Sequence, residues 1–182
     1  MGYRYLLRAL ADGGRSDVIY EINNQSEKPG YGYQLKQGAT SLTEAWDAGR
    51  HSSQNHFMLG QITEWFYHDL AGIRCDPAGP GFRRIILKPA VVGDLTWVKA
   101  TCKSIRGPIS SYWNREGDKI LLKAGIPANT TATIWLPTAS EHGITEGRMP
   151  AERSQGVQFL RMEKGYAVFK VGAGEYEFRS RP

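Results

Sequence analysis

Cysteine is scarce in this sequence: Cys75 and Cys102 are the only two among 182 residues. Two thiols are too few for a disulfide framework or a four-ligand zinc site, so we expect both to be unpaired. Long hydrophobic runs are also missing, because no stretch approaches the ~20 apolar residues that a membrane-spanning helix requires. The first residues lack the apolar core of a secretory signal peptide. The sequence therefore predicts no membrane span and leaves the compartment open.

Dense runs of one charge are absent too, although the net charge is +5. Residues 1–78 carry 7 Lys or Arg and 9 Asp or Glu, a net of −2, whereas residues 79–182 carry 16 and 9, a net of +7. The basic residues of the second part are scattered, and their longest run is Arg83-Arg84. A nucleic-acid-binding surface needs a denser basic stripe interleaved with aromatic side chains. We therefore expect no nucleic-acid partner.

The first half of the chain has the apolar spacing of helices. Residues 3–10 predict one helix, and a second helix begins at Ser16, a residue type that caps helix N-termini. A third helix is predicted over residues 56–70, and its apolar face is wider than a surface helix needs. These helices either lie across one face of a neighbouring sheet or end a helical domain whose earlier helices precede them. The wide apolar face favours the second arrangement.

The second half changes to short runs rich in β-branched and aromatic residues, separated by glycine and proline. We expect strands at residues 84–88, 95–105, 109–115, 119–126, 131–136, 157–162, 167–171 and 176–178. Gly117-Asp118 predicts a hairpin turn, whereas residues 138–156 show no period and predict a surface loop. Successive strands without intervening helices favour antiparallel pairing in a β-sandwich.

The expected fold is therefore α+β, in two segments. The helical segment covers residues 1–78, and the antiparallel β-sandwich covers residues 79–182. The boundary is expected within Asp76–Gly81, because its proline and glycine content is typical of a linker.

Residues 31–56 carry the most unusual chemistry, because aromatic, amide, carboxylate and histidine side chains crowd into one connection. Aromatic faces that stack on sugar C–H groups, beside polar groups that read hydroxyls, are the usual lining of a carbohydrate site. The candidate site residues are Tyr31, Glu44, Trp46, Asn55 and His56.

Each candidate also has a purely structural interpretation. Ser41 and Glu44 match a capping box, in which the carboxylate only accepts a main-chain N–H bond. Trp46 could be a core aromatic, and Asn55 could cap the third helix. The two histidines of the segment lie five residues apart, which matches no common zinc spacing, so we expect no metal.

One continuous series of motifs runs along residues 3–137. Its members are Gly38–Trp46, Asn55-His56 with Gly60, Glu64–Tyr67, Leu70–Ile73, Pro80–Pro89, Gly93–Trp97 and Ile126–Thr133. Together they resemble the C-terminal part of bacterial α-L-rhamnosidases, and a series in one order is more specific than any single motif.

The resemblance implies a fold and an activity. Members of the family have an (α/α)6-barrel catalytic domain followed by a C-terminal β-sandwich, and they hydrolyse terminal α-L-rhamnosides with inversion of configuration. Inversion requires a general acid and a general base, with water between the base and the sugar. By the resemblance, Glu44 is the general base, His56 and Trp46 belong to the substrate pocket, and no cofactor is needed. Thr43 and Ala45 depart from the tryptophan and arginine that flank the glutamate in many members.

The general acid of the family lies on an earlier loop of the barrel, and residues 1–43 contain no counterpart. Glu21 and Glu27 match no acid-bearing motif. We therefore expect a C-terminal fragment that supplies the base but is inactive alone. Its expected partners are a rhamnose-containing carbohydrate and either a preceding barrel domain or a second copy that covers the helical face.

Two alternatives stay open at this point. The chain could be a non-catalytic carbohydrate-binding or accessory β-sandwich module, or a purely structural module that closes a neighbouring domain. Local geometry separates the enzyme fragment from the accessory module. Glu44, Trp46 and His56 on one concave surface favour the fragment, whereas a bond from Glu44 to the Ser41 N–H and a fully buried Trp46 favour the module.

Overall fold

The chain forms two units in the computed structural model, which describes residues 2–27 and 29–182. The first unit contains Met1–Phe66 with Val91–Asp94, and the second contains Tyr67–Ala90 with Leu95–Pro182. The boundary expected at residues 78–79 lies inside the second unit. It falls between two strands that pair with each other, so the units divide earlier, within the helical run.

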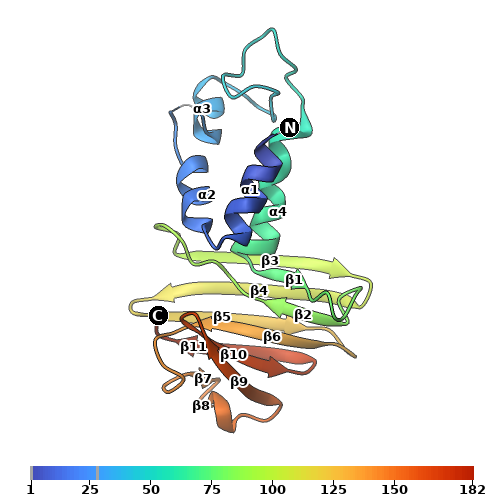
Figure 1. Ribbon diagram of the computed structural model, residues 1–182, viewed down its shortest axis with the longest axis vertical. Coiled ribbons are helices and arrows are strands. Elements are labelled where there is room, and N and C mark those ends of the chain that lie inside the picture. The colour runs from blue at the N-terminus through green and yellow to red at the C-terminus, as the bar shows by residue number, and fades with distance from the viewer. Residues whose placement is uncertain (1, 28) are drawn as a thin grey trace. The chain divides into compact units, whose positions relative to one another are not determined.

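The first unit is helical, and its helices are short (Figure 1). They are α1 (Gly2–Asp12), α2 (Ser16–Asn23), α3 (Tyr31–Lys36), the 3₁₀ helix η1 (Phe57–Gln61) and α4 (Ile62–Trp65). Helix α1 contacts α2, η1 and α4, and its buried residues are Leu7 and Ala11. The two helices expected before residue 30 are confirmed, whereas α3 lies in the segment expected to be a connection.

The third expected helix is a single helical run whose geometry changes twice. It begins as η1, continues as α4 and ends in the second unit as the π-helical turn η2 (Phe66–Leu70). Gly72, with a φ of +76°, follows the run. A Cβ atom on Gly72 would lie 2.3 Å from the Lys88 carbonyl carbon, so only glycine fits this close approach.

The expectation that Ser16 caps α2 is wrong. The cap position belongs to Arg15, which makes no side-chain cap bond, and Ser16 is the first residue of the helix. The buried Ser16 hydroxyl instead accepts a 3.1 Å hydrogen bond from Nε1 of the buried Trp65. A buried indole N–H needs an acceptor, and this tertiary requirement overrides the local preference of serine for a cap.

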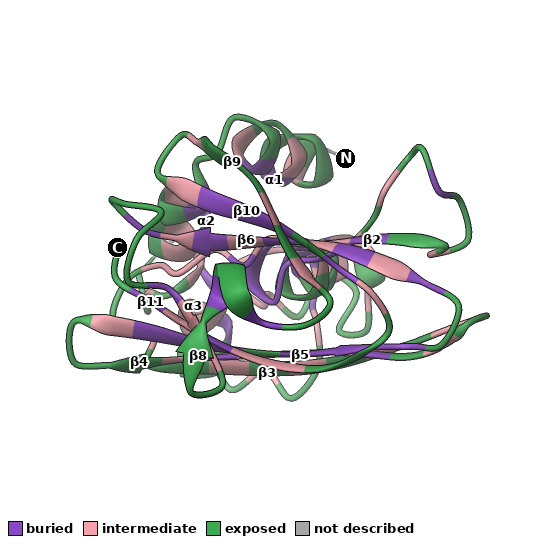
Figure 2. Ribbon diagram, turned by 90° about the horizontal axis from the view of Figure 1, so that it is seen from below, coloured by how far each residue is buried: buried purple, intermediate pink, exposed green. Residues whose placement is uncertain are grey.

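The second unit is a sandwich of two sheets, which Figure 2 shows as two layers of strands. One sheet has the order β1-β2-β6-β10-β9, and the other has the order β3-β4-β5-β11-β7-β8. The strands of the first sheet are β1 (Ile73–Cys75), β2 (Arg84–Leu87), β6 (Thr131–Pro137), β9 (Val157–Glu163) and β10 (Tyr166–Val171). Those of the second sheet are β3 (Trp97–Ser104), β4 (Gly107–Glu116), β5 (Lys119–Ile126), β7 (Thr145–Glu146), β8 (Met149–Pro150) and β11 (Gly174–Ser180).

The strand pairing is antiparallel, as expected, with one exception among the described strands. β2 runs parallel to β6, with Arg84 opposite Thr131 and Leu87 opposite Ile134. The expected hairpin at Gly117-Asp118 is confirmed, because β4 and β5 pair across it. Alternation along the strands supplies the core, as in β6, where every second residue is buried.

Residues 138–156 were expected to form a surface loop, and this expectation is wrong. The segment contains β7, β8 and the short 3₁₀ helix η3 (Ala151–Arg153), and β7 pairs with β11. Ile144 and Ala151 are buried, so the segment contributes apolar side chains to the sandwich. Two-residue strands are too short to show a period in the sequence.

Cys75 and Cys102 are free thiols. No helix within residues 2–27 and 29–182 is long and apolar enough to cross a membrane.

The sandwich core makes two hydrogen bonds to the chain that leads into it. Trp113 on β4 is fully buried, and its Nε1 donates to the Leu70 carbonyl at 2.9 Å. Two residues earlier, the Ser111 hydroxyl donates to the Ala71 carbonyl at 2.7 Å. The last carbonyls of a helical run have no partner within the helix, so these two side chains satisfy them inside the unit.

Replacing Trp113 with alanine should lower the free energy of unfolding by about 3–5 kcal/mol, because it leaves a cavity and an unpaired Leu70 carbonyl. Urea unfolding followed by circular dichroism measures this loss. The matched control is Trp97→Ala, because Trp97 lies on neighbouring β3 and is 59% exposed. This control should change stability by about 0.5 kcal/mol at most. Equal losses in the two variants would contradict the role of Trp113.

Candidate functional site

The segment that carries the candidate residues folds back on itself through main-chain hydrogen bonds. The Glu44 N–H donates to the Ser53 carbonyl at 2.9 Å, and the His56 N–H donates to the Leu42 carbonyl at 2.7 Å. The Ser41 hydroxyl donates to the Gln54 carbonyl on the same side. Two passes of the chain, residues 41–44 and residues 53–56, therefore lie next to each other and bring Glu44 and His56 onto neighbouring passes.

Glu44 is exposed, and one of its carboxylate oxygens is fixed by the main chain. Its Oε2 accepts a 3.1 Å hydrogen bond from the Ser53 N–H. The capping box considered for Ser41 and Glu44 is not formed, because no helix begins between them and the two side chains bond to the opposite pass. Within the described residues, Oε1 accepts no hydrogen bond. The carboxylate is thus oriented at one oxygen and open to solvent.

A buried polar network holds the main chain on both sides of Glu44. Gln34 on α3 and Thr43 are both buried, at 3% and 1% exposure. Gln34 Nε2 donates to Thr43 Oγ1 at 2.7 Å and to the Ala45 carbonyl at 3.3 Å. The Thr43 hydroxyl donates to the same carbonyl at 2.7 Å. Buried polar groups with satisfied partners fix a unique local conformation, so this network positions the residue between Thr43 and Ala45.

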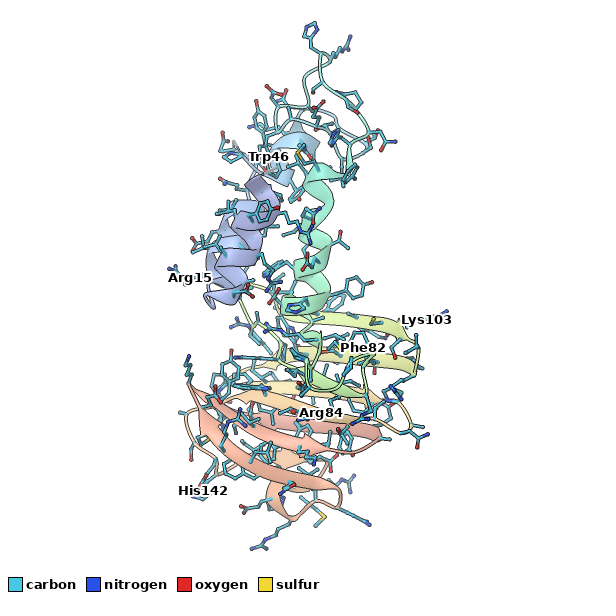
Figure 3. All side chains as sticks on the ribbon, turned by 45° about the vertical axis from the view of Figure 1, so that its right-hand side comes forward. Arg15, Trp46, Phe82, Arg84, Lys103 and His142 are labelled. Atoms are coloured by element: carbon cyan, nitrogen blue, oxygen red, sulfur yellow. The ribbon has the colours of Figure 1, made fainter. Side chains whose placement is uncertain are left out.

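Three aromatic rings gather beside this network. Trp46, labelled in Figure 3, meets the ring of Tyr31 at 5.1 Å and the ring of Tyr3 at 5.3 Å between centroids, both edge to face. The two phenols have protein partners, because Tyr31 donates to the Leu59 carbonyl and Tyr3 donates to Asn23 Oδ1. Burial raises the pKa of both tyrosines, so their hydroxyls stay protonated donors at neutral pH. Trp46 keeps part of its surface exposed and is not a fully buried core aromatic.

His56 and Asn55 lie at the start of η1. His56 occupies the cap position, and its Nδ1 accepts a 3.1 Å hydrogen bond from the Met58 N–H. The imidazole is half-buried and stacks on Phe57, with 5.4 Å between centroids and 10° between planes. A nitrogen that accepts a bond carries no proton, so Nε2 is the protonated nitrogen of the neutral ring. Asn55 is exposed, and the capping role considered for it belongs to His56.

The structure therefore brings four of the candidates together in two pairs, and both pairs lie within residues 31–56. Glu44 and His56 lie on neighbouring passes, and Tyr31 and Trp46 touch through their rings. The sequence did not point to Gln34 and Tyr3, because only the fold reveals that one is buried and the other completes the aromatic cluster. No group of three or more His, Cys, Asp or Glu side chains in the described parts of the chain could hold a metal ion.

Comparison with known protein families matches both units. Residues 1–70 match the bacterial alpha-L-rhamnosidase 6 hairpin glycosidase domain, and residues 72–149 match the bacterial alpha-L-rhamnosidase C-terminal domain. An alpha-L-rhamnosidase of Streptomyces avermitilis is 33% identical over 98% of this chain, and one of Formosa agariphila is 26% identical over 100% of this chain. The chain spans 17% and 20% of the length of these two relatives.

Solved structures give the same result. The Streptomyces avermitilis alpha-L-rhamnosidase complexed with L-rhamnose superposes with a TM-score of 0.85 at 32% identity. The alpha-L-rhamnosidase from Dictyoglumus thermophilum superposes with a TM-score of 0.86, also at 32% identity. Each match covers 98% of this chain and 17% or 20% of the other protein. The chain belongs to the bacterial alpha-L-rhamnosidase family and corresponds to the C-terminal part of its members.

Proposed function

We propose that this chain is the C-terminal part of an inverting α-L-rhamnosidase and that Glu44 is its general base. The substrate would be a terminal α-L-rhamnoside. The observation that carries the proposal is the carboxylate of Glu44, exposed and held at one oxygen by the Ser53 N–H, within a segment that matches the glycosidase domain of the family.

The proposed step is removal of a proton from water by Glu44 as the water attacks the anomeric carbon. The Ser53 N–H holds Oε2, and the exposed carboxylate can receive a water molecule at Oε1. An inverting mechanism also needs a general acid, about 6.5–9.5 Å from the base, to protonate the leaving oxygen. We propose that a preceding part of the enzyme supplies it, because the relatives are five to six times longer than this chain.

The remaining candidates suit recognition of the sugar. The exposed part of Trp46 offers an apolar surface to sugar C–H groups, and Tyr31 holds that ring edge to face. His56 Nε2 and the exposed Asn55 amide make no hydrogen bond to another described residue, so they can read hydroxyl groups, since His56 uses Nδ1 within η1. Tyr31 itself acts by positioning, because its hydroxyl is bonded to the Leu59 carbonyl.

Two features favour this proposal over an accessory module. Glu44 is not a capping residue, and Trp46 is not fully buried.

The exposed apolar residues of α1, Tyr5 at 71% and Leu6 at 46%, suit packing against preceding helices of the same domain. We propose these helices, rather than a second copy, as the natural cover of that face, because residues 1–70 match a glycosidase domain and the chain spans only 17% and 20% of two relatives.

The 182-residue chain alone should not hydrolyse an aryl α-L-rhamnoside above the rate in buffer, because in this proposal a preceding part of the enzyme supplies the general acid and the rest of the pocket. A chimaera in which the upstream domains of the Streptomyces avermitilis relative precede residue 2 should restore turnover. In this chimaera, Glu44→Gln should lower kcat by about 10²–10⁴-fold. The control is Glu21→Gln, an exposed carboxylate of α2, which should leave kcat unchanged. An active E44Q chimaera would refute the proposed base.

Thr43→Val should lower the free energy of unfolding by about 1–3 kcal/mol, because it removes the hydroxyl that pairs the buried Gln34 amide. In the chimaera it should also lower kcat, since Glu44 loses its fixed position. Thr43→Ser keeps the hydroxyl and should restore both quantities. Thr63→Val on α4 is the matched control, because Thr63 is exposed. Equal behaviour of the Thr43 and Thr63 valine variants would show that the network does not position Glu44.

A further inference from the structure

The sandwich contains a cavity of about 620 Å³ that the proposed hydrolysis does not use. It lies where the parallel strands β2 and β6 begin, and β9 and β10 complete its wall. This volume is in the range of small-molecule sites. Its lining residues are Arg83, Arg84, Ile85, Asn129, Thr130, Thr131, Ala132, Thr133, Leu160 and Lys170.

The strand register explains why polar side chains of three strands meet here. Arg84 of β2 lies opposite Thr131 of β6, and Thr133 of β6 lies opposite Lys170 of β10. Residues opposite each other on paired strands share one face of the sheet, and residues two apart on one strand also share it. These four side chains therefore stand on the face turned away from the buried Ala132 and its neighbours.

The charge of this cavity is one-sided. Three of the ten lining residues are cationic and none is acidic. Arg84 pairs with Asp76 at 3.2 Å and remains half exposed, whereas Arg83 and Lys170 have no ion-pair partner among the described residues. A hollow lined by one sign of charge concentrates the opposite ion. Arg83 and Lys170 are both exposed to solvent, so their charges are available to an anion that enters the cavity.

Two residues close to the starts of β2 and β6 have a left-handed main-chain conformation. Phe82 and Asn129 both have a φ of +58°. Phe82 precedes the lining residue Arg83 just before β2, and Asn129 is itself a lining residue, two positions before β6. Figure 3 labels Phe82 and Arg84 on this stretch of chain. A left-handed conformation is unfavourable for a bulky residue such as phenylalanine and is often kept where it shapes a binding site.

We propose that this cavity binds a carboxylated sugar, a uronic acid residue, through its basic and hydroxyl side chains. Arginine presents a planar fork that matches a carboxylate, and lysine adds a point charge. Asn129 and the hydroxyls of Thr131 and Thr133 supply the donors and acceptors that sugar hydroxyls need. Leu160 gives an apolar wall for the sugar ring. This inference is independent of the role of Glu44 and goes beyond rhamnoside hydrolysis.

The test is titration of the 182-residue chain with D-galacturonate, D-galactose and sulfate, followed by ¹H–¹⁵N NMR. Galacturonate and galactose differ at one carbon, so they isolate the contribution of the carboxylate. Arg83→Gln and Lys170→Gln each remove one charge from the cavity. Lys103→Gln removes one charge from exposed Lys103 on β3, in the other sheet, and is the matched control.

Galacturonate should shift the amide signals of the cavity residues, and galactose should bind at least tenfold more weakly. Each cavity variant should weaken galacturonate binding by about tenfold, the value of a charged hydrogen bond. The Lys103 variant should bind as the unchanged chain does. The proposal is overturned if galacturonate fails to bind, if both cavity variants bind it normally, or if sulfate binds as tightly as the sugar acid. The spectra of the variants also report folding, so a misfolded variant is recognised directly.

Discussion

A buried amide determines the shape of the segment that carries Glu44. Gln34 is removed from water, and an amide in that position must find partners or destabilise the fold. Thr43 and the Ala45 carbonyl are those partners, so the main chain approaches α3 on both sides of Glu44 while its carboxylate stays outside. The neighbouring pass then supplies the Ser53 N–H. The orientation of an exposed acid thus follows from the burial of a neutral side chain.

The fold could be predicted from the sequence wherever apolar residues kept one regular spacing over several residues. The long strands and the turn at Gly117-Asp118 are examples, since alternation reflects one buried face. The segment 138–156 was missed because its strands have two residues each. Ser16 was wrongly predicted to be a helix cap, because its hydrogen-bond partner, Trp65, lies 49 residues away and no local pattern predicts that bond. Apolar spacing also cannot separate 3₁₀, α and π geometry within residues 57–70.

Residue types and the family resemblance were enough to name the candidate site residues. They were not enough to name the residues that hold these candidates in place. Glu44, Trp46 and His56 belong to chemical classes that sugar sites use, and they stand within one short segment. Gln34 gave no signal, because glutamine is usually exposed and its burial here depends on Thr43. The cavity of the sandwich was equally hidden, since Arg84, Thr133 and Lys170 come from separate parts of the chain. Only the register of β2, β6 and β10 unites them.

The parallel pair β2–β6 has a consequence for how the sandwich can be assembled. Between these strands the chain builds β3, β4 and β5, which form a meander of sequential neighbours in the other sheet. Pairing over such a sequence separation is slower than hairpin formation, so the meander can form first. During synthesis, the edge of β2 that pairs with β6 stays unpaired until residues 131–134 leave the ribosome. An unpaired edge invites strands from other molecules, which makes this interval the point at which the nascent sandwich is most exposed to aggregation.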